Sequence, residues 1–468
     1  MVSDTILGHH RRRLARSGHG GTLDAEGAGW AADGPQPRPG CSLEVLIDGA
    51  EALPRIAQEI GKARFRVYLA GWFFSPHFDL TRDQTPSPLR DLLAAAAERL
   101  DVRVLSWAGA PLPLFHPSRK TVSVMRESLC RGTRIRCALD ARERPMHCHH
   151  EKIIVIDDRI AFVGGIDLTF ENGDRFDTSR HVARGSVGWH DLSSRLDGPA
   201  VDDLAGHFRM RWHEVTGERL ETAPAAPGVP AGPHTVQITR TIPEQIYTAA
   251  PRGEFGILES YLAALRSARS LVYLENQFLW SPEIANVLRD KLRNPPSKEF
   301  RLLLVLPAKP NAGGEDTRGT LSELVEADAG RGRMLACTLY ARRGPEADPV
   351  YIHAKLSIVD DRWLTLGSAN LNDHSLFNDT EVNVVTLDPA LARHTRLRLW
   401  AEHLECTIEE ASGNATRLFE ERWKPISAEQ LDRRSRGLPL THRLVRLPHV
   451  TRRTGRLLGP LQGILVDG

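Results

Sequence analysis

Two matching sets of histidine, lysine and aspartate are the side chains of this chain best suited to chemistry. They lie in CHHEKIIVIDDRIAFVGGID at residues 148–167 and in YIHAKLSIVDDRWLTLGSAN at residues 351–370. Aligning the two segments pairs His150 with His353, Lys152 with Lys355, Asp157 with Asp360 and Asp167 with Asn370. The shared pattern is H-x-K-x4-D-x6-G-[GS]-x-[DN]. Only eight residues of the chain are lysine, so a lysine at the same place in both copies indicates a specific use.

The spacing within each pattern predicts a phosphate site. Each pattern runs into an apolar, strand-like stretch, and alternate side chains of a strand point to the same face. The histidine and lysine of each pair should therefore face the same way. A lysine ammonium suits phosphate oxygens, and two imidazoles can divide the roles of nucleophile and acid. Facing copies would form one site that cleaves a phosphodiester by double displacement, and we expect no metal or other cofactor to be needed.

The elements around the motifs repeat as well. ARFRVYLAGWFFSP at 63–76 is similar to ARSLVYLENQFLWSP at 268–282, and each follows a helical pattern and precedes a further apolar strand. Strands that alternate with helices indicate an α/β architecture, and the internal repeat indicates two similar units. The predicted fold is therefore α/β, with two similar α/β/α sandwich units that share one central active-site cleft.

Composition shifts suggest where these units begin and end. Residues 1–40 are rich in Gly, Arg, Ala and Pro without periodicity, which predicts a disordered tail. A first unit over 41–220 is followed by a Pro/Ala/Gly linker at 221–235 and a second unit over 236–468. The second unit contains a basic, leucine-interleaved segment at 433–460. This segment is either a surface for anionic lipid or a solvated tail docked on the domain.

Charge and composition narrow the function classes. The formal net charge of +2 argues against a protein built mainly to coat nucleic acid. Six scattered cysteines do not indicate a disulfide framework, so a reducing compartment is expected. We find no apolar run near the ~20 residues of a membrane-spanning helix, and the basic N-terminus lacks the apolar core of a secretory signal. The expected location is therefore cytoplasmic or peripheral to a membrane.

The duplicated motif resembles that of the phospholipase D superfamily, and the resemblance runs from about residue 41 to the end. Four further segments are similar to its phospholipid-cleaving branch: GGIDLTFENGDRFD at 164–177, WHDLSSRLDGPAV at 189–201, VYLENQFL at 272–279 and GSANLNDHSLFNDTE at 367–381. The resemblance implies a covalent phosphohistidine intermediate that is resolved by water or by an alcohol. By position, it makes His150 the nucleophile and His353 the acid, with Lys152 and Lys355 holding the phosphate.

The resemblance also implies supporting residues. Glu381 lies 28 residues after His353, where a family carboxylate orients a catalytic imidazole, and Asp177, 27 residues after His150, is the nearest first-half match. The expected substrate contacts are Asp167, Asn370, Gly165 and Ser368. Asp157 and Asp360 complete the catalytic motif, but a more structural role is expected for them. Ala354 and His374 stand where the family usually has Ser and Arg, so the head-group contacts are not predicted.

Three activities are compatible with this reading. The first is phospholipase D-type cleavage of a glycerophospholipid head group, the second is phosphatidyl transfer of the cardiolipin synthase type, and the third is a nuclease built on the same site. The charge and the lipid-branch segments favour a glycerophospholipid substrate with contact to a membrane surface, and no nucleic acid. No protein partner can be deduced. The run His147, Cys148 and His149 has poor geometry for a metal along a strand, and His149 is expected to support the site from behind.

Overall fold

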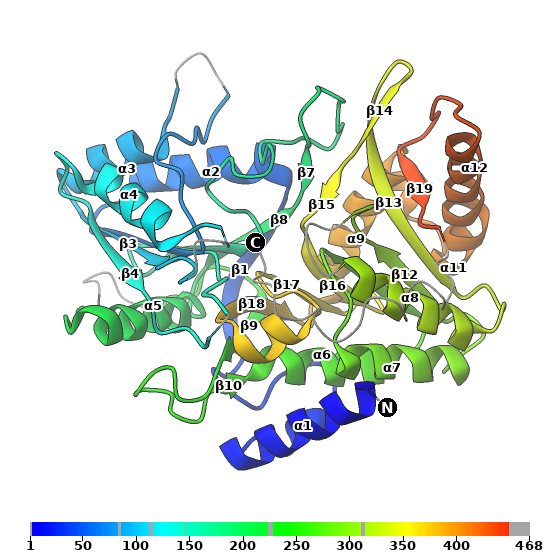
Figure 1. The fold of residues 1–468 in the computed structure, drawn as a ribbon, viewed down its shortest axis with the longest axis horizontal. Coiled ribbons are helices and arrows are strands. Elements are labelled where there is room, and N and C mark those ends of the chain that lie inside the picture. Colours follow the sequence, from blue (N-terminus) through cyan, green and yellow to red (C-terminus); the bar gives the residue numbers. More distant parts are fainter. Residues whose placement is uncertain are drawn as a thin grey trace.

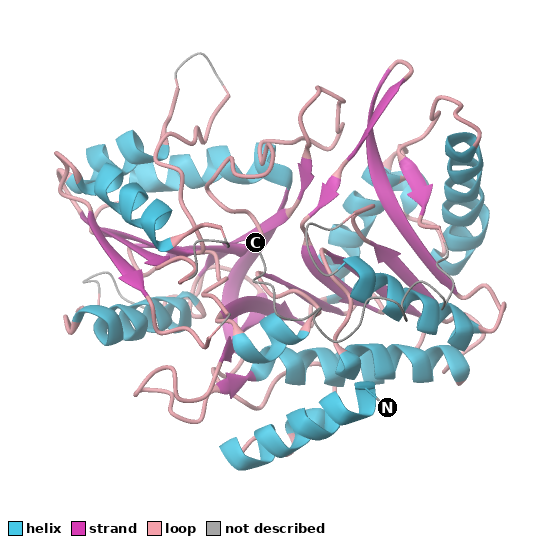
Figure 2. Ribbon diagram, in the orientation of Figure 1, coloured by secondary structure: helices cyan, strands magenta, loops and turns pink. Residues whose placement is uncertain are grey.

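The structure is a computed structural model that describes residues 2–82, 86–111, 116–145, 147–222, 228–309 and 314–448. Within these ranges, two sets of strands lie side by side, with helices above and below them in the view of Figure 1. The same layering is visible when the ribbon is coloured by secondary structure (Figure 2). The expected α/β fold is confirmed.

The strands of the two halves follow the same order. The first half runs β1 (Arg38–Ile47), β8 (Leu192–Asp197), β6 (Ile160–Gly164), β5 (Ile153–Ile156), β2 (Arg66–Gly71), β3 (Asp101–Trp107) and β4 (Arg136–Asp140). The second half runs β9 (His234–Ile242), β18 (Glu381–Thr386), β17 (Trp363–Gly367), β16 (Lys355–Val359), β11 (Leu271–Asn276), β12 (Arg301–Val305), β13 (Met334–Arg343) and β19 (Leu444–Arg446). β1 pairs antiparallel with β9, which joins the halves. Each motif therefore enters an equivalent strand, β5 or β16.

Helices occupy equivalent places in the two halves. α2 (Asp48–Lys62) precedes β2 as α6 (Gly256–Ser267) precedes β11, and α5 (Val201–Thr216) follows β8 as α9 (Pro389–His403) follows β18. The remaining longer helices are α3 (Leu89–Ala97), α4 (Arg119–Cys130), α7 (Pro282–Arg293), α8 (Gly314–Asp328) and α12 (Lys424–Ser435), with short α10 (Ile408–Ala411) and α11 (Ala415–Leu418) between α9 and α12. None of the helices in the described ranges combines the length and the apolar composition needed to cross a bilayer.

Central strands are buried on both faces, as parallel strands between two helical layers must be. In β12, Leu302 and Leu304 pack with the apolar residues of α6, α7 and α8. Leu303 and Val305, on the opposite face, pack into the apolar cluster that includes α5 and α9. Because both faces of β12 are buried, its sequence RLLLV contains a continuous apolar run and does not alternate between apolar and polar residues.

The motif aspartates hold hairpin turns. Asp157 and Asp360 both have positive φ, of 55° and 53°, in the turns that follow β5 and β16. The Asp157 carboxylate accepts three backbone N–H groups from residues 64–66, at 2.7–2.9 Å. The Asp360 carboxylate does the same for residues 269–271, at 2.7–2.8 Å. Each aspartate thus fixes its hairpin to the start of the neighbouring strand, in agreement with the structural role expected for it.

The structure differs from the sequence prediction over the first 40 residues. α1 (Val2–Ser17) is helical and packs near α7 (Figure 1). Leu14 is fully buried, and Arg13 donates to Glu244 at 2.8 Å. β1 already begins at Arg38. Contacts with the second half stabilise this segment, and such contacts are not encoded in its own composition.

The other two boundary predictions fall partly on residues outside the described ranges. The predicted linker at 221–235 includes residues 223–227, which are not described, and β9 begins inside its C-terminal end at His234. In the basic segment 433–460, α12 ends at Ser435 and β19 spans Leu444–Arg446, while residues 449–460 lie outside the described ranges.

Candidate active site

Backbone hydrogen bonds cross between the halves directly at both motifs. The N–H groups of His150 and Glu151 donate to the carbonyl of Thr380, both at 3.0 Å. The N–H groups of His353 and Ala354 donate to the carbonyl of His190 at 2.8 and 3.2 Å. The same pair of contacts is therefore made twice: once from the first motif to the second half, and once from the second motif to the first half. Each motif is fixed against the segment that leads into β18 or β8 of the other half.

The residue after each of these carbonyls is an acid that contacts the motif histidine. His150 Nδ1 lies 2.9 Å from Glu381 Oε1, and His353 Nδ1 lies 2.7 Å from Asp191 Oδ2. Both histidines and both acids are buried. A carboxylate on Nδ1 holds the proton there and leaves Nε2 as the basic nitrogen. Each histidine therefore receives its orienting carboxylate from the opposite half.

Asp177, predicted as the first-half carboxylate, does not contact either motif histidine. Its Oδ2 lies 3.0 Å from His181 Nδ1, and its Oδ1 accepts from Arg184 at 3.2 Å. The strand register identifies Asp191 as the equivalent of Glu381, because Gly164 pairs with Ser193 as Gly367 pairs with Asn383. The prediction failed because it counted residues from the histidine.

An unequal loop explains the error. Asp191 lies 27 residues after Gly164, whereas Glu381 lies only 14 residues after Gly367. The additional residues belong to the 165–188 loop, which connects β6 to β7 (Trp189–His190). Asp191 was present in the WHDL segment quoted for the family resemblance. An alignment of the two strands that begin just after it would have identified it.

The two motif lysines are buried beside amide and carboxylate groups. Lys152 Nζ lies 3.4 Å from Asp167 Oδ1. Lys355 Nζ donates to Gln277 Oε1 at 3.2 Å, and Asn370 Nδ2 donates to the same oxygen at 3.3 Å. Burial lowers the pKa of Lys355 to about 8, although Asp191 opposes this shift. Asp167 and Asn370 thus lie at equivalent places, next to the lysine of their own half.

Charges from both halves act on one imidazole. Burial lowers the pKa of His353, and Lys355, Lys152, Arg175 and His150 lower it further, in that order. The Arg175 guanidinium lies 3.6 Å from the centroid of the Trp189 ring. That ring lies 4.5 Å from the ring of His353. The two motifs therefore contribute to one cationic cluster rather than to two separate sites.

The glycine-led turns differ at one position. A Cβ atom at Gly165 would lie 2.2 Å from Asp191 Oδ1, so this position must be glycine while Asp191 stays in place. Ser368, at the equivalent position, donates its hydroxyl to Glu381 Oε2. Both residues were predicted as substrate contacts; in the structure Ser368 contacts Glu381, and Gly165 leaves room for Asp191.

Sequence reasoning missed four residues of this cluster: Asp191, Arg175, Trp189 and Gln277. Arg175 lies in the GDRFD segment, Trp189 in WHDL and Gln277 in ENQF. Those segments indicated the family likeness, but of their side chains only Asp177 was given a role. Gln277 directly follows the apolar strand β11, Trp189 and Asp191 lie just before β8, and Arg175 lies within the loop between β6 and β7.

His147 and His149, which lie just before the first motif histidine, contact different partners. His147 Nδ1 lies 2.9 Å from His374 Nδ1 and 3.5 Å from Asp379 Oδ1. His149 Nδ1 lies 2.7 Å from Thr380 Oγ1, and its Nε2 lies 3.2 Å from Asp140. The two histidines do not converge on one ligand set. His149 lies directly behind the motif, where the sequence predicted a supporting role.

A second group of histidines and acids lies behind the His353 side. His190 Nδ1 lies 2.9 Å from Asp48 and its Nε2 lies 2.8 Å from Glu275. His181 Nε2 lies 3.0 Å from Glu402. Burial lowers the pKa of His181, but Asp48 and the other acids outweigh it and raise this pKa to about 9. The donor set is rich enough to ligate a cation, and the distances between its atoms are those of hydrogen-bonded ion pairs.

Comparisons with known proteins show what this chain is similar to. A protein-family model described as "Cardiolipin synthase, PLD-like domain" matches residues 261–401. Phospholipase D A of Dictyostelium discoideum is 25% identical over 460 residues, which cover 78% of this chain and 35% of that protein. Phospholipase D2 of Bos taurus is 24% identical, with 75% of this chain and 50% of that protein covered. The chain thus spans a third to a half of the length of these relatives.

The fold has a counterpart among solved structures. The phosphatidylserine synthase of Haemophilus influenzae superposes with a TM-score of 0.50 at 15% identity, covering 76% of this chain and 84% of that one. This likeness concerns the fold. The matched domain and the curated relatives together support the assignment to the phospholipase D superfamily that the duplicated motif suggested.

Proposed function

We propose that this protein is a phosphodiesterase that transfers the phosphatidyl group of a glycerophospholipid to water or to an alcohol. The observation that carries the proposal is the pair of buried histidines, each held by a carboxylate from the opposite half. Two lysines accompany them in the same cationic cluster. Positive charge at the reacting phosphate and two positioned imidazoles are what double displacement at phosphorus requires.

The proposed first step forms a phosphohistidine. Nε2 of His150 attacks phosphorus, and the bond from phosphorus to the head-group oxygen breaks. His353 gives its Nε2 proton to that oxygen, so the head group leaves as a neutral alcohol. The negative charge of the arriving phosphate offsets the burial that disfavours a charged His353. Asp191 stabilises the imidazolium form of His353 until its proton is transferred.

The proposed second step regenerates the enzyme. His353 takes a proton from water or an alcohol, the acceptor oxygen attacks phosphorus, and the nitrogen–phosphorus bond to His150 breaks. Lys152 and Lys355 neutralise the phosphate oxygens throughout. The assignment of His150 as nucleophile rests on its position in the family motif. Because imidazoles and ammonium groups supply the charge and the protons, EDTA is expected to leave turnover in detergent micelles unchanged.

An exposed apolar loop supports contact with a lipid surface. Phe170, Val182 and Val187 are 56%, 47% and 42% exposed, and all three lie in the 165–188 loop. The same loop contributes Arg175 to the cluster around His353. Apolar side chains exposed this close to the site favour access from a membrane surface.

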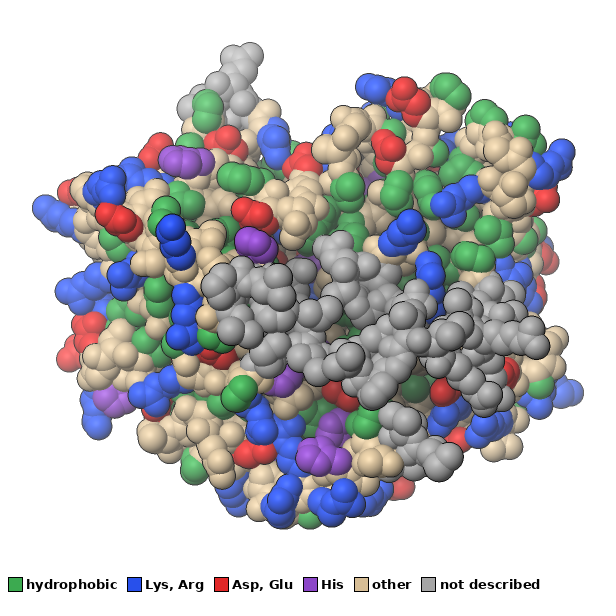
Figure 3. All heavy atoms as spheres, in the orientation of Figure 1, with side chains coloured by type: hydrophobic (Ala, Val, Ile, Leu, Met, Phe, Trp, Pro, Cys, Tyr) green, Lys and Arg blue, Asp and Glu red, His purple; other side chains and the backbone are tan. Residues whose placement is uncertain are grey.

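Two alternatives remain as outcomes of the test. Phosphatidyl transfer to a lipid alcohol is favoured by the cardiolipin synthase description of the matched domain. A nuclease is disfavoured, because Lys and Arg side chains on the face seen in Figure 3 are interspersed with acidic and apolar ones outside the grey atoms. Nucleic-acid binding usually relies on a continuous basic surface.

The test is product analysis. The purified chain is incubated with phosphatidylcholine, phosphatidylglycerol or phosphatidylethanolamine, with and without ethanol, and the lipids are identified by mass. We expect phosphatidic acid without ethanol and phosphatidylethanol with it, and neither product with the His150→Ala variant. Cardiolipin as the main product from phosphatidylglycerol would identify the transferase. Cleavage of an oligonucleotide without turnover of any lipid would overturn the proposal.

A further inference from the structure

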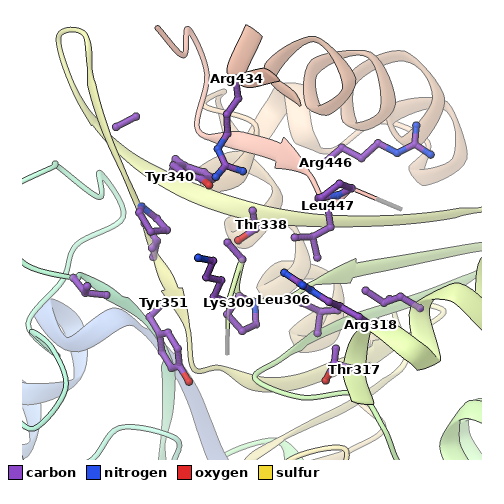
Figure 4. Close-up of a pocket in the computed structure, with 18 of the residues that line it drawn as sticks. Leu306, Lys309, Thr317, Arg318, Thr338, Tyr340, Tyr351, Arg434, Arg446 and Leu447 are labelled. Carbon is purple, nitrogen blue, oxygen red and sulfur yellow. The ribbon is translucent and has the colours of Figure 1, made fainter. Parts of the chain in front are cut away.

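A cavity of about 510 Å³ lies in the second half, next to the His353 side of the candidate site. Its walls come from α8, α12, β13 and β19, and from the residues that follow β12, with Asn172 and Val187 of the first half at one edge. Figure 4 shows Arg434 and Tyr340 on one side of the cavity and Thr317 and Arg318 on the opposite side. The volume is that of a site for a ligand of substantial size, since ligand sites usually occupy roughly 300–1,000 Å³.

The lining combines apolar walls with positive charge. Apolar surface comes from Leu306, Leu321, Tyr340, Val350 and Leu447. Four cationic side chains also line the cavity: Lys309, Arg318, Arg434 and Arg446. Of the described residues that form these walls, none is acidic. A cavity of this composition suits an amphiphile that carries negative charge.

Two of the four cations make no ion pair with a described acid. The guanidinium of Arg434 lies 5.2 Å from the centroid of the Tyr340 ring, and Lys309 is exposed. Elsewhere on the surface, arginines are commonly paired, as Arg343 is with Glu346 at 3.0 Å. Thr338 adds a buried hydroxyl that has no hydrogen-bond partner among the described residues. These groups remain available to an anionic ligand.

One side chain separates the cavity from the candidate site. Tyr351 lines the cavity, and its ring stacks at 6.2 Å on that of His353. Its hydroxyl accepts a hydrogen bond from Gln277 at 2.9 Å, and Gln277 in turn accepts from Lys355. A ligand in the cavity therefore lies one residue away from the proposed acid and from one phosphate-binding lysine.

We propose that this cavity binds the substrate lipid and selects a glycerophospholipid with net negative charge. The proposal rests on the proposed function and names the substrate class of that site. The apolar walls hold the acyl-bearing part. Lys309 and Arg434 add to the positive potential that acts on the lipid phosphate, which itself reacts at the neighbouring histidines. A choline or ethanolamine head group carries a positive charge, which the four cationic side chains of the cavity would repel. A glycerol head group carries no such charge.

The test uses short-chain lipids below the concentration at which they form micelles, so that no lipid surface is present. Binding of dihexanoyl phosphatidylglycerol and dihexanoyl phosphatidylcholine is measured with the His150→Ala background, which prevents turnover. We expect tighter binding of phosphatidylglycerol, and about tenfold weaker binding after Lys309→Met combined with Arg434→Gln, from two partly exposed charge contacts. Binding of phosphatidylcholine should stay unchanged.

Two control variants make the result specific to the cavity. Arg343→Gln removes an exposed arginine that does not line it and should leave phosphatidylglycerol binding unchanged. Ala347→Trp fills part of the cavity from β14 (Glu346–Pro349) and should weaken binding of both lipids. Equal affinity of the original His150→Ala protein for both lipids, or an equal loss with Arg343→Gln, would overturn the inference. If the cavity binds the anionic lipid selectively but the native protein turns over no lipid, the cavity is confirmed as a lipid site and the proposed function is rejected.

Discussion

The two halves of the candidate site share a backbone but differ in how each carboxylate is held. Glu381, which orients His150, accepts hydroxyl hydrogen bonds from Ser375, at 2.5 Å, and from Ser368. Asp191, which orients His353, accepts its own neighbour's backbone N–H, from Leu192 at 2.8 Å. The two halves thus share the contact between histidine and carboxylate but differ in the groups that hold each carboxylate.

The difference follows from side-chain length. The longer Glu381 leaves room for Ser368 and uses its hydroxyl. The shorter Asp191 is held so close to the turn that only Gly165 fits beside it. Behind Asp191, the carbonyl that fixes His353 belongs to His190, whose ring is held by Asp48 and Glu275. The two carboxylates therefore differ in their direct supports: Glu381 accepts from hydroxyl groups, and Asp191 accepts from a backbone N–H.

The largest expected effect distinguishes the two histidines themselves. With a lipid substrate, His150→Ala and His353→Ala should each lower kcat/KM about 1,000-fold or more, because general acid–base groups contribute roughly 10²–10⁴. With a p-nitrophenyl phosphodiester, whose leaving group needs no proton, only His353→Ala should still accumulate a phosphoryl adduct. Acid quenching and peptide mass mapping measure this. An adduct on His353 of the native protein would reverse the two roles.

The second prediction concerns the carboxylates. Asp191→Asn and Glu381→Gln should each lower kcat about 100-fold, since either change stops the carboxylate from stabilising an imidazolium. Asp177→Asn, which alters a carboxylate that contacts His181 and Arg184 instead, should affect thermal stability more than kcat. Steady-state kinetics and melting curves separate the two effects. A larger loss of kcat in Asp177→Asn than in Asp191→Asn would restore the assignment made from residue counting.

The third prediction exchanges the two turns. Gly165→Ser should displace Asp191 from His353 and lower kcat about tenfold to 100-fold, the value of a charge-assisted hydrogen bond. Ser368→Gly removes one hydroxyl contact to Glu381 and should lower kcat only about two- to tenfold. Both are measured by kinetics on the same lipid. Equal losses would show that the two supports are equivalent despite their different construction.

The smallest expected effect is on the pH profile. Burial raises the pKa of Asp191 to about 7, although Lys355 opposes this. A raised carboxyl pKa means that the ionised form, which supports His353, is lost as the pH falls through 7. Activity should therefore fall on the acid side, to about a tenth of the plateau one unit below that pKa. Profiles of kcat between pH 5 and 9 should show this acid-side decrease in Glu381→Gln but not in Asp191→Asn. A decrease that persists in Asp191→Asn would show that another group causes it.

The motif residues themselves could be predicted from the sequence because they recur. Two copies of one pattern identified His150, Lys152, His353 and Lys355, and the repeat predicted equivalent strands on either side. Asp157 was expected to be more structural than catalytic, and its carboxylate accepts three backbone N–H groups in the structure. Glu381 was correctly singled out, although the histidine that it orients could not be named.

What lay outside the motifs was not predictable in the same way. Asp191 was missed because a longer loop changes the residue count but not the strand register. The first 40 residues were expected to be disordered because their composition shows no periodicity. Helix α1 is instead stabilised by contacts of Arg13 and Leu14 with residues of the second half. Both errors concern interactions between segments that are far apart in the chain.

By itself, the sequence determined the duplicated chemistry and the strands that carry it, because side-chain type and period are local properties of the chain. Only the tertiary structure decided which carboxylate serves which histidine. That choice depends on how one half packs against the other, which brings Thr380 to His150 and His190 to His353. Carboxylate and imidazole are more than 160 positions apart in each pair. A contact of that separation is set by the packing of two folded halves, because no local pattern in either segment encodes its partner.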